Sequence, residues 1–236
     1  MLSFSSFNAF GSANLNVGQS HVPVWLGKVQ PVPVGGTLDK SFVASGMLLN
    51  AGFPVKLAGK IITPFYGWEV VSFTAAVGSG TTDTLVIRPL MIGGIKVLPA
   101  VDDLIQKVGS TFAATGKAGA VASISEITEE GATKGCYTIT ILHSATIDTP
   151  SAGDVVTLSS AVSAGSSKSL KVQPNGYLYN DIYLGALEGD ADAYTLAASG
   201  AVVMYHPTGL LVELTPAAAV KAQMAAAVPG VYQHLV

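Results

Sequence analysis

The chain is poor in charge, in aromatic residues and in cysteine, and each shortage excludes a class of protein. Only 11% of the 236 residues are charged, with 12 Lys and Arg against 15 Asp and Glu and a formal net charge of −3. Soluble globular domains carry about 25% charged residues. A basic surface that binds nucleic acid is therefore not expected. The single cysteine, Cys136, excludes a scaffold held by internal disulfides.

The sequence also lacks a secretion signal and a long apolar run. No basic residue precedes Lys28, and the N-terminal segment has no apolar core of the kind that signal peptides need. A notable apolar and uncharged stretch, residues 193–205, is shorter than the 18 or more apolar residues that indicate a membrane helix. We therefore expect synthesis in the cytoplasm without export, and no membrane partner.

Small and aliphatic side chains are what the chain has in abundance. Apolar residues make up 49% of the sequence although only 8% are aromatic, and there are 26 glycines. This hydrophobicity excludes intrinsic disorder, and the length allows one or two domains. Because few charges leave a monomer little protection against association, we predict that copies of the chain or a partner cover much of its surface.

Residues 1–35 are predicted to form an extended N-terminal arm that binds a partner. Pro23, Pro31 and Pro33 exclude long regular elements there. The apolar but proline-broken segment 22–26 suits an extended strip that lies in a groove. Tryptophan dominates the hot spots of interfaces, so the predicted partner-binding residues are Val22, Val24, Trp25 and Leu26.

Short apolar runs separated by Gly, Pro and Asn predict a mainly β fold. We expect a β-barrel or sandwich module over residues 67–167, inserted into a β-rich base domain made of residues 36–66 and 168–236. The two flanking segments are expected to pack together because neither is long enough to build a good core alone. One short C-terminal helix is predicted over residues 216–226, where Thr215 is the N-cap and Pro216 the first helical residue.

The module contains a candidate two-fold internal repeat with an offset of 51 residues. Residues 70–74 (VVSFT) align with residues 121–125 (VASIS), and six of the 36 positions from 70 to 105 are identical. Chance similarity is the alternative explanation. The turn residues also align at this offset: Gly80 with Gly131, Thr82 with Thr133, Pro99 with Pro150 and Asp103 with Asp154. Two such units would bury their apolar faces on each other in a pseudo-symmetric barrel or sandwich.

After the module, Asn175-Gly176 predicts a tight hairpin turn. Both residues tolerate positive φ, and they stand between apolar runs at 170–172 and 177–179. The two runs are therefore expected to pair with each other.

No motif of catalysis or nucleotide binding is present. The nearest approach to a phosphate loop ends in Lys117-Ala118 and lacks the first glycine and the final hydroxyl. Asp190 and Asp192 could ligate Ca²⁺ but lack the further carboxylates of a dedicated site. Cys136 is predicted to be a small core residue, and the four histidines, which have no metal-ligand spacing, are His21, His143, His206 and His234. We predict no catalytic residue, no cofactor, no metal and no enzymatic activity.

Three short segments resemble phage head proteins. They are residues 51–55 (AGFPV), 174–181 (PNGYLYND) and 228–232 (VPGVY). Each is similar to a segment of the capsid head-fibre and head decoration (auxiliary capsid) proteins of crAss-like and related tailed phages, and the likeness in outline covers residues 36–236. The resemblance implies a β-rich, non-enzymatic virion protein on the capsid exterior, bound to the major capsid protein and often trimeric. We therefore expect the arm at residues 1–35 to bind the capsid or another partner. The chain has no long fibre-forming extension, which favours a compact knob or cement protein.

Three functions are therefore weighed. The first is a structural virion protein that decorates or stabilises the capsid. The second is a phage or surface adhesin that binds carbohydrate, which should expose aromatic platforms although Trp25 and Trp68 are the only tryptophans. The third is a hydrolase assembled from scattered residues, because fold alone excludes little. A homotrimer is expected, with Ala222 and Ala226 at the subunit contact, because closed symmetry avoids open-ended fibres.

Overall fold

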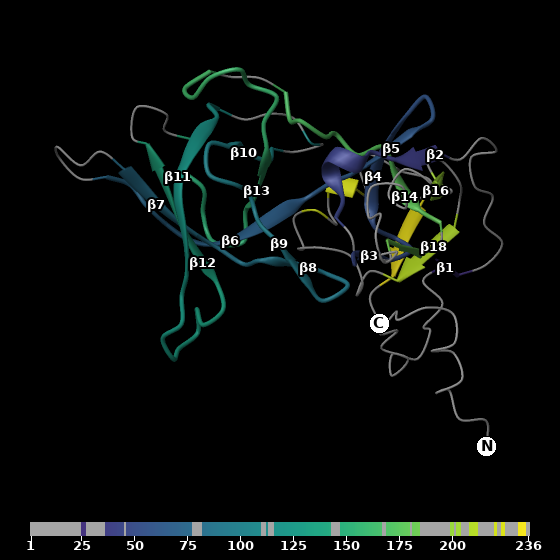
Figure 1. Cartoon of the computed structure of the whole chain (residues 1–236), viewed down its shortest axis with the longest axis horizontal. Helices are drawn as coiled ribbons and strands as arrows, with labels where there is room; N and C mark the ends of the chain where they lie inside the picture. Colours follow the sequence, from purple (N-terminus) through teal and green to yellow (C-terminus); the bar gives the residue numbers. More distant parts are fainter. Residues whose placement is uncertain are drawn as a thin grey trace, which may run out of the picture.

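The structure is a computed structural model of the chain. It describes residues 25–26, 36–44, 46–76, 82–109, 112, 116–142, 147–166, 169–179, 181–184, 199–200, 202–203, 208–211, 220, 223–224 and 231–234. Within them, a closed β-barrel lies beside a second group of strands that is called the base below (Figure 1). The predicted mainly β fold with a barrel is confirmed.

Six antiparallel strands close the barrel in the order β10-β11-β12-β7-β6-β13. Side chains alternate between its interior and its exterior, as the period of two along a strand requires. In β7, for example, Leu85 and Ile87 are buried, whereas Thr84 and Val86 between them remain partly exposed. The strands are β6 (Gly67–Thr74), β7 (Thr82–Ile87), β10 (Leu104–Lys107), β11 (Gly119–Glu126), β12 (Tyr137–Leu142) and β13 (Val155–Leu158).

The base takes its strands from both sides of the barrel sequence. Its main sheet has the order β16-β2-β5-β4-β14-β17, and β2 and β5 are parallel. These strands are β2 (Gly36–Leu38), β4 (Pro54–Ala58), β5 (Ile61–Pro64), β14 (Gly176–Leu178), β16 (Ser199–Gly200) and β17 (Val202–Val203). Smaller sheets join β3 (Leu48–Leu49) to β15 (Ile182–Tyr183), and β1 (Trp25–Leu26) to β18 (Thr208–Leu211) and β19 (Val231–His234).

Helical structure is confined to short segments in the described residues. A 3-10 turn, η2 (Lys40–Phe42), begins where the carboxylate of Asp39 accepts the N–H of Ser41 at 3.0 Å. In the segment predicted as the C-terminal helix, Val220, Gln223 and Met224 are helical. The other residues between 216 and 226 lie outside the described part of the chain.

The pairing of the barrel strands is unchanged when its two halves are exchanged. If β6, β7 and β10 take the places of β11, β12 and β13, every neighbouring pair maps onto another pair of the same barrel. Such an exchange corresponds to a pseudo-twofold axis that passes between β7 and β12 and between β10 and β13. At the second point Gln106 is paired with Thr157, which is 51 residues further along the chain.

Local irregularities repeat at the same offset of 51. The register between β6 and β7 shifts between Val70 and Ser72, and that between β11 and β12 shifts between Val121 and Ser123. A residue at positive φ precedes the last strand of each half, namely Asp102 at +70° and Gly153 at +86°. β-Bulges and positive φ are specific local features, so their recurrence at one offset is a more specific likeness between the two halves than similar apolar composition.

The two aspartates that begin these last strands make equivalent hydrogen bonds. The carboxylate of Asp103 accepts the N–H of Ala100, and that of Asp154 accepts the N–H of Ser151, both at 2.7 Å. Their backbone carbonyls accept the N–H groups of Val121 and Val70 at 3.0 and 2.8 Å. In each half, this aspartate therefore closes a turn and connects it to the first strand of the other half.

One of the aligned pairs, Thr82 and Thr133, does not coincide in space. Thr82 begins β7, whereas Thr133 lies in the turn before β12. Ser72 and Val86 are paired across 14 positions, whereas Ser123 and Thr140 are paired across 17. The second half therefore has a turn longer by three residues, and β7 matches β12 at an offset of 54.

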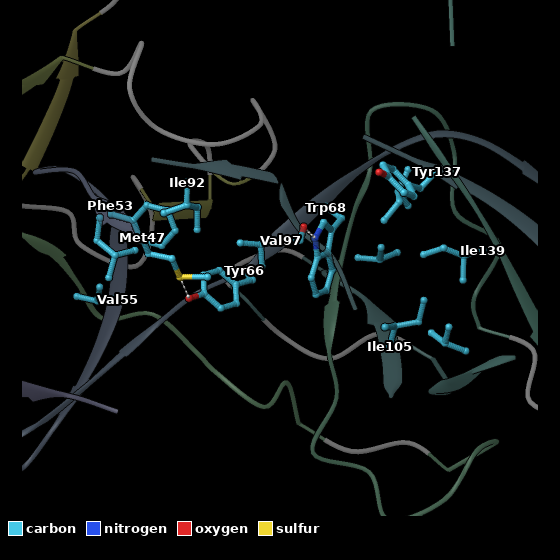
Figure 2. Packing of buried hydrophobic residues seen from close by; sticks show 14 of the residues in the cluster. Met47, Phe53, Val55, Tyr66, Trp68, Ile92, Val97, Ile105, Tyr137 and Ile139 are labelled. Atoms are coloured by element: carbon cyan, nitrogen blue, oxygen red, sulfur yellow. Dashed lines mark hydrogen bonds between the residues drawn. The ribbon is translucent and has the colours of Figure 1, made fainter. Parts of the chain in front are cut away.

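One hydrophobic core runs from the base into the barrel (Figure 2). It contains Leu49 and Val55 of the base together with Ile105 and Ile139 of the barrel. Trp68 lies between these groups, and its Nε1 donates to the carbonyl of Val97 at 2.9 Å. The barrel and the base are thus parts of one packed body.

A hairpin of β8 (Leu90–Ile92) and β9 (Ile95–Val97) connects the barrel to the base. Its turn glycine, Gly93, lies so close to β3 that a Cβ there would be 2.5 Å from the backbone nitrogen of Leu48. A second buried cluster includes Phe65 and Tyr177 of the base, Val155 of the barrel and the helical Val220 and Met224.

The predicted hairpin at Asn175-Gly176 is wrong. β14 pairs with β4, so that Gly176 lies opposite Val55, and Leu170 instead bridges to Ser159. The side chain of Asn175 accepts the N–H of Leu57 at 2.8 Å and donates to its carbonyl at 3.0 Å. Asn175 therefore acts as one further pairing residue beside β4, and neither it nor Gly176 has the positive φ that a tight hairpin turn requires.

Candidate partner-binding site

The predicted partner-binding segment lies in a small sheet with the C-terminal strands. Trp25 and Leu26 form β1 and pair antiparallel with Leu210 and Gly209 of β18. β18 also pairs in parallel with β19, so it lies in the middle of the sheet. Val22 and Val24 lie outside the described residues. Segments from the beginning and the end of the sequence thus meet in one three-stranded sheet, which is called the terminal sheet below.

The terminal sheet and the barrel lie at opposite ends of the molecule. Figure 1 shows β1 and β18 beside the base, on the side away from β7, β11 and β12. Both β1 and β19 are outer strands of the terminal sheet as described. Outer strands have one row of backbone N–H and C=O groups that can pair with another chain.

The segment predicted to contact other subunits also packs within its own chain. Val220 and Met224 are buried in the second cluster, and a Cβ on Gly67 of the barrel would lie 3.2 Å from Val220. The side-chain oxygen of Gln223 accepts the N–H of Phe112 at 3.0 Å. Ala222 and Ala226, the predicted subunit contacts, lie outside the described residues.

Buried polar side chains support the wall of the barrel near the base. Gln106 is completely buried on β10, and its amide donates to the carbonyl of Gly116 at 3.0 Å and accepts the hydroxyl of Ser159 at 2.9 Å. The hydroxyl of Thr157 donates to the carbonyl of Tyr66 at 2.5 Å. Buried polar groups require hydrogen-bond partners, and the hydrogen bonds of these side chains hold the barrel wall together.

Two ion pairs shift the pKa values of their carboxylates. Lys96 of β9 donates to Glu126 at 2.7 Å and to the hydroxyl of Tyr137 at 3.1 Å. The bond to Glu126 raises the pKa of Lys96, and the same bond lowers the pKa of Glu126. Burial alone would raise the pKa of Asp154, but hydrogen bonds from Lys107 and the N–H of Ser151 lower it below its usual range. Both pairs connect segments of the barrel region.

Trp68 and Cys136, two residues considered as candidates in the sequence analysis, are buried in the structure. Trp68 is 1% exposed, so it provides no aromatic platform. Cys136 is buried, as predicted for a core residue. His234 lies in β19, while His21, His143, His206, Asp190 and Asp192 are outside the described residues.

The described residues contain neither a cluster of metal ligands nor a membrane-spanning helix. No group of three or more His, Cys, Asp or Glu side chains in the described part could hold a metal ion. None of the helices described there is long and apolar enough to span a membrane.

The exterior of four barrel strands carries an array that the sequence reasoning missed. On β6, β7, β12 and β11, eight outward positions in two rows include seven hydroxyl side chains and one valine, and none is buried. The strand register gives the rows as Ser72–Val86–Thr138–Ser125 and Thr74–Thr84–Thr140–Ser123. We call these eight residues the hydroxyl face. A signal was present in the sequence, because each of the four strands contains Ser or Thr two positions apart, at 72 and 74, 82 and 84, 123 and 125, and 138 and 140.

Comparisons with known proteins identify no relative. No protein-family model, no curated protein and no solved structure matches the chain. Its function must therefore be argued from its own residues.

Proposed function

We propose that the chain is a structural virion protein that decorates or stabilises a phage capsid by binding the major capsid protein. The observation that carries the proposal is the arrangement of the molecule along its length. The predicted partner-binding strand β1 lies at one end, and the barrel lies at the other. A protein attached through the terminal sheet would therefore hold its barrel away from the shell.

The internal packing supports this role. A decoration protein has to keep one shape while it is fixed to a surface, and the base and the barrel share one hydrophobic core. The hairpin β8–β9 adds a second connection, because Gly93 lies against Leu48 and Trp68 is bonded to Val97. The low content of charge, 11%, suits a chain whose surface is partly covered in an assembly.

Capsid binding can be tested by cosedimentation. The full chain, a chain without residues 1–35 and a Trp25→Asp/Leu26→Asp variant are mixed with capsids that consist of the major capsid protein alone. We expect the full chain to sediment with the capsids and the other two to remain in the supernatant. Circular dichroism should retain the β signal of the truncated chain, because the described strands of the barrel and of the main base sheet begin at Gly36 or later.

A matched control places the same kind of change on the barrel instead of on the terminal sheet. Val101 is 53% exposed beside the barrel, and Val101→Asp should leave capsid binding unchanged. Binding of the truncated chain at full occupancy would contradict attachment through the arm. Loss of binding in Val101→Asp alone would mean that the barrel, and not the terminal sheet, faces the shell.

We further propose that the protein assembles as a symmetric homo-oligomer, a trimer, on the capsid exterior. Several weak capsid contacts made at once raise the apparent affinity by roughly 10²–10⁴. Ala222→Glu/Ala226→Glu should give monomers that bind capsids poorly, as measured by sedimentation velocity and the same binding assay. A wild-type protein that is monomeric at micromolar concentration and still saturates capsids would contradict the oligomer and leave decoration intact.

A further inference from the structure

We propose that the hydroxyl face of the barrel is a binding site for neutral polysaccharide. The eight residues lie on four adjacent antiparallel strands, and the hydroxyls of Ser123 and Thr140 are 2.7 Å apart. The other five hydroxyls have no hydrogen-bond partner among the described residues. They are therefore available to a ligand.

The chemistry of the face selects an uncharged ligand rich in hydroxyl groups. Each Ser or Thr hydroxyl offers one donor and two acceptor positions, and a sugar hydroxyl offers the same set. No position of the face carries a charge. The charged side chains that flank the face are paired with one another: Arg88 pairs with Glu69 at 3.5 Å, and Glu126, which follows Ser125 on β11, pairs with Lys96 at 2.7 Å. Nothing on the face would therefore select a phosphate or a carboxylate.

The size of the face favours a sugar chain over a protein. Four strands about 4.8 Å apart and two rows about 7 Å apart give an array of roughly 14 Å by 7 Å between the outermost backbones. A stable protein contact buries roughly 800 Å² on each partner, far more than this array supplies. A few consecutive sugar units fit it, so we exclude a second copy of the chain as the occupant.

The pseudo-twofold axis of the barrel makes the two rows equivalent. Exchange of the halves carries Ser72 to Ser123 and Ser125 to Thr74, so that each row takes the place of the other in the reverse order. A chain of sugars would therefore meet similar hydroxyls whichever end it presents first. Because the strongest exposed contacts to sugars, aromatic rings, are missing from these eight positions, each site is expected to bind weakly. Many copies on one particle would provide the avidity.

The test uses the full-length protein in affinity gel electrophoresis with soluble polysaccharides. Neutral dextran, mannan and galactan are cast in separate gels, with acidic alginate in a fourth. We expect retardation in at least one neutral gel and none in alginate. Thr84→Val/Thr140→Val should weaken that retardation about tenfold, because it removes two central hydroxyls and keeps shape and β propensity. Valine already occupies Val86 in the same array.

A control variant changes a threonine outside the hydroxyl face. Thr63→Val, in β5 of the base and also half-buried, should run as the wild type does. If the double variant fails to fold by circular dichroism, Ser72→Ala/Ser125→Ala tests the outer columns of the face instead. The proposal is overturned if no neutral gel retards the protein, if only alginate does, or if the folded variants are retarded like the wild type. It is also overturned if the hydroxyl variants change sedimentation and not retardation, because the face would then bind another copy of the chain.

Discussion

Trp68→Phe should destabilise the whole body and not the barrel alone. Trp68 is 1% exposed at the junction of barrel and base, and its Nε1 bonds to Val97 at 2.9 Å. Phenylalanine has three fewer heavy atoms, which at about 0.8 kcal/mol for each buried group costs roughly 2 kcal/mol. The lost hydrogen bond adds about 0.5–1.5 kcal/mol. We therefore expect the free energy of unfolding to fall by about 3 kcal/mol.

The assay is urea unfolding followed by far-UV circular dichroism and, independently, by tryptophan fluorescence, which in Trp68→Phe comes from Trp25 alone. If the core is continuous, both probes report one transition whose midpoint moves to lower urea while its slope is unchanged. Val162→Ala, at a side chain that is 87% exposed, is the matched control and should lie within about 0.5 kcal/mol of the wild type. Two separate transitions, with only one of them shifted by Trp68→Phe, would refute the shared core.

Two further predictions concern the hairpin and the acid limb of stability. Gly93 and Gly94 both have positive φ, at +58° and +85°, but only at Gly93 would a Cβ meet Leu48. In thermal unfolding, Gly94→Ala should lower the free energy of unfolding by about 1–2 kcal/mol, and Gly93→Ala should lower it by about 1–3 kcal/mol more. Equal losses for the two variants would contradict the contact between the hairpin and β3. Because the pKa of Asp154 is lowered in the folded state, its contribution is present above the unfolded pKa near 4 and is lost as pH falls through the folded value. Wild type should therefore exceed Asp154→Asn in stability at pH 7 and approach it near pH 2, and a constant difference at both pH values would contradict this linkage.

The spacing of the turn residues, the prolines and aspartates, predicted the barrel better than the apolar runs did. The pairs Pro99–Pro150 and Asp103–Asp154 keep an offset of 51 because each aspartate closes the same turn and its carbonyl accepts an N–H from the other half. Apolar runs alone cannot fix pairing, since a slip of one residue only turns a strand over. The mismatch at Thr82 arises because a loop on the surface can gain residues at little cost.

Other features could not be predicted because they depend on distant partners. Asn175-Gly176 has the composition of a hairpin turn, but the side-chain amide of Asn175 forms hydrogen bonds with the backbone of Leu57, 118 residues away in sequence. Only the three-dimensional arrangement of β4 and β14 reveals this use. The hydroxyl face was missed for a similar reason, because Ser and Thr two positions apart become an array only when four strands lie in register.

Departures from the internal symmetry are what join the barrel to the base. The first half contains the hairpin β8–β9 between β7 and β10, whereas no hairpin is described between β12 and β13 in the second half. That hairpin contacts Leu48 through Gly93 and receives the hydrogen bond of Trp68 through Val97. A perfectly symmetric barrel would offer the base two equivalent docking positions. Because the described hairpin belongs to the first half, the barrel docks in one orientation, and the hydroxyl face on β6, β7, β12 and β11 is held in a fixed direction relative to the terminal sheet.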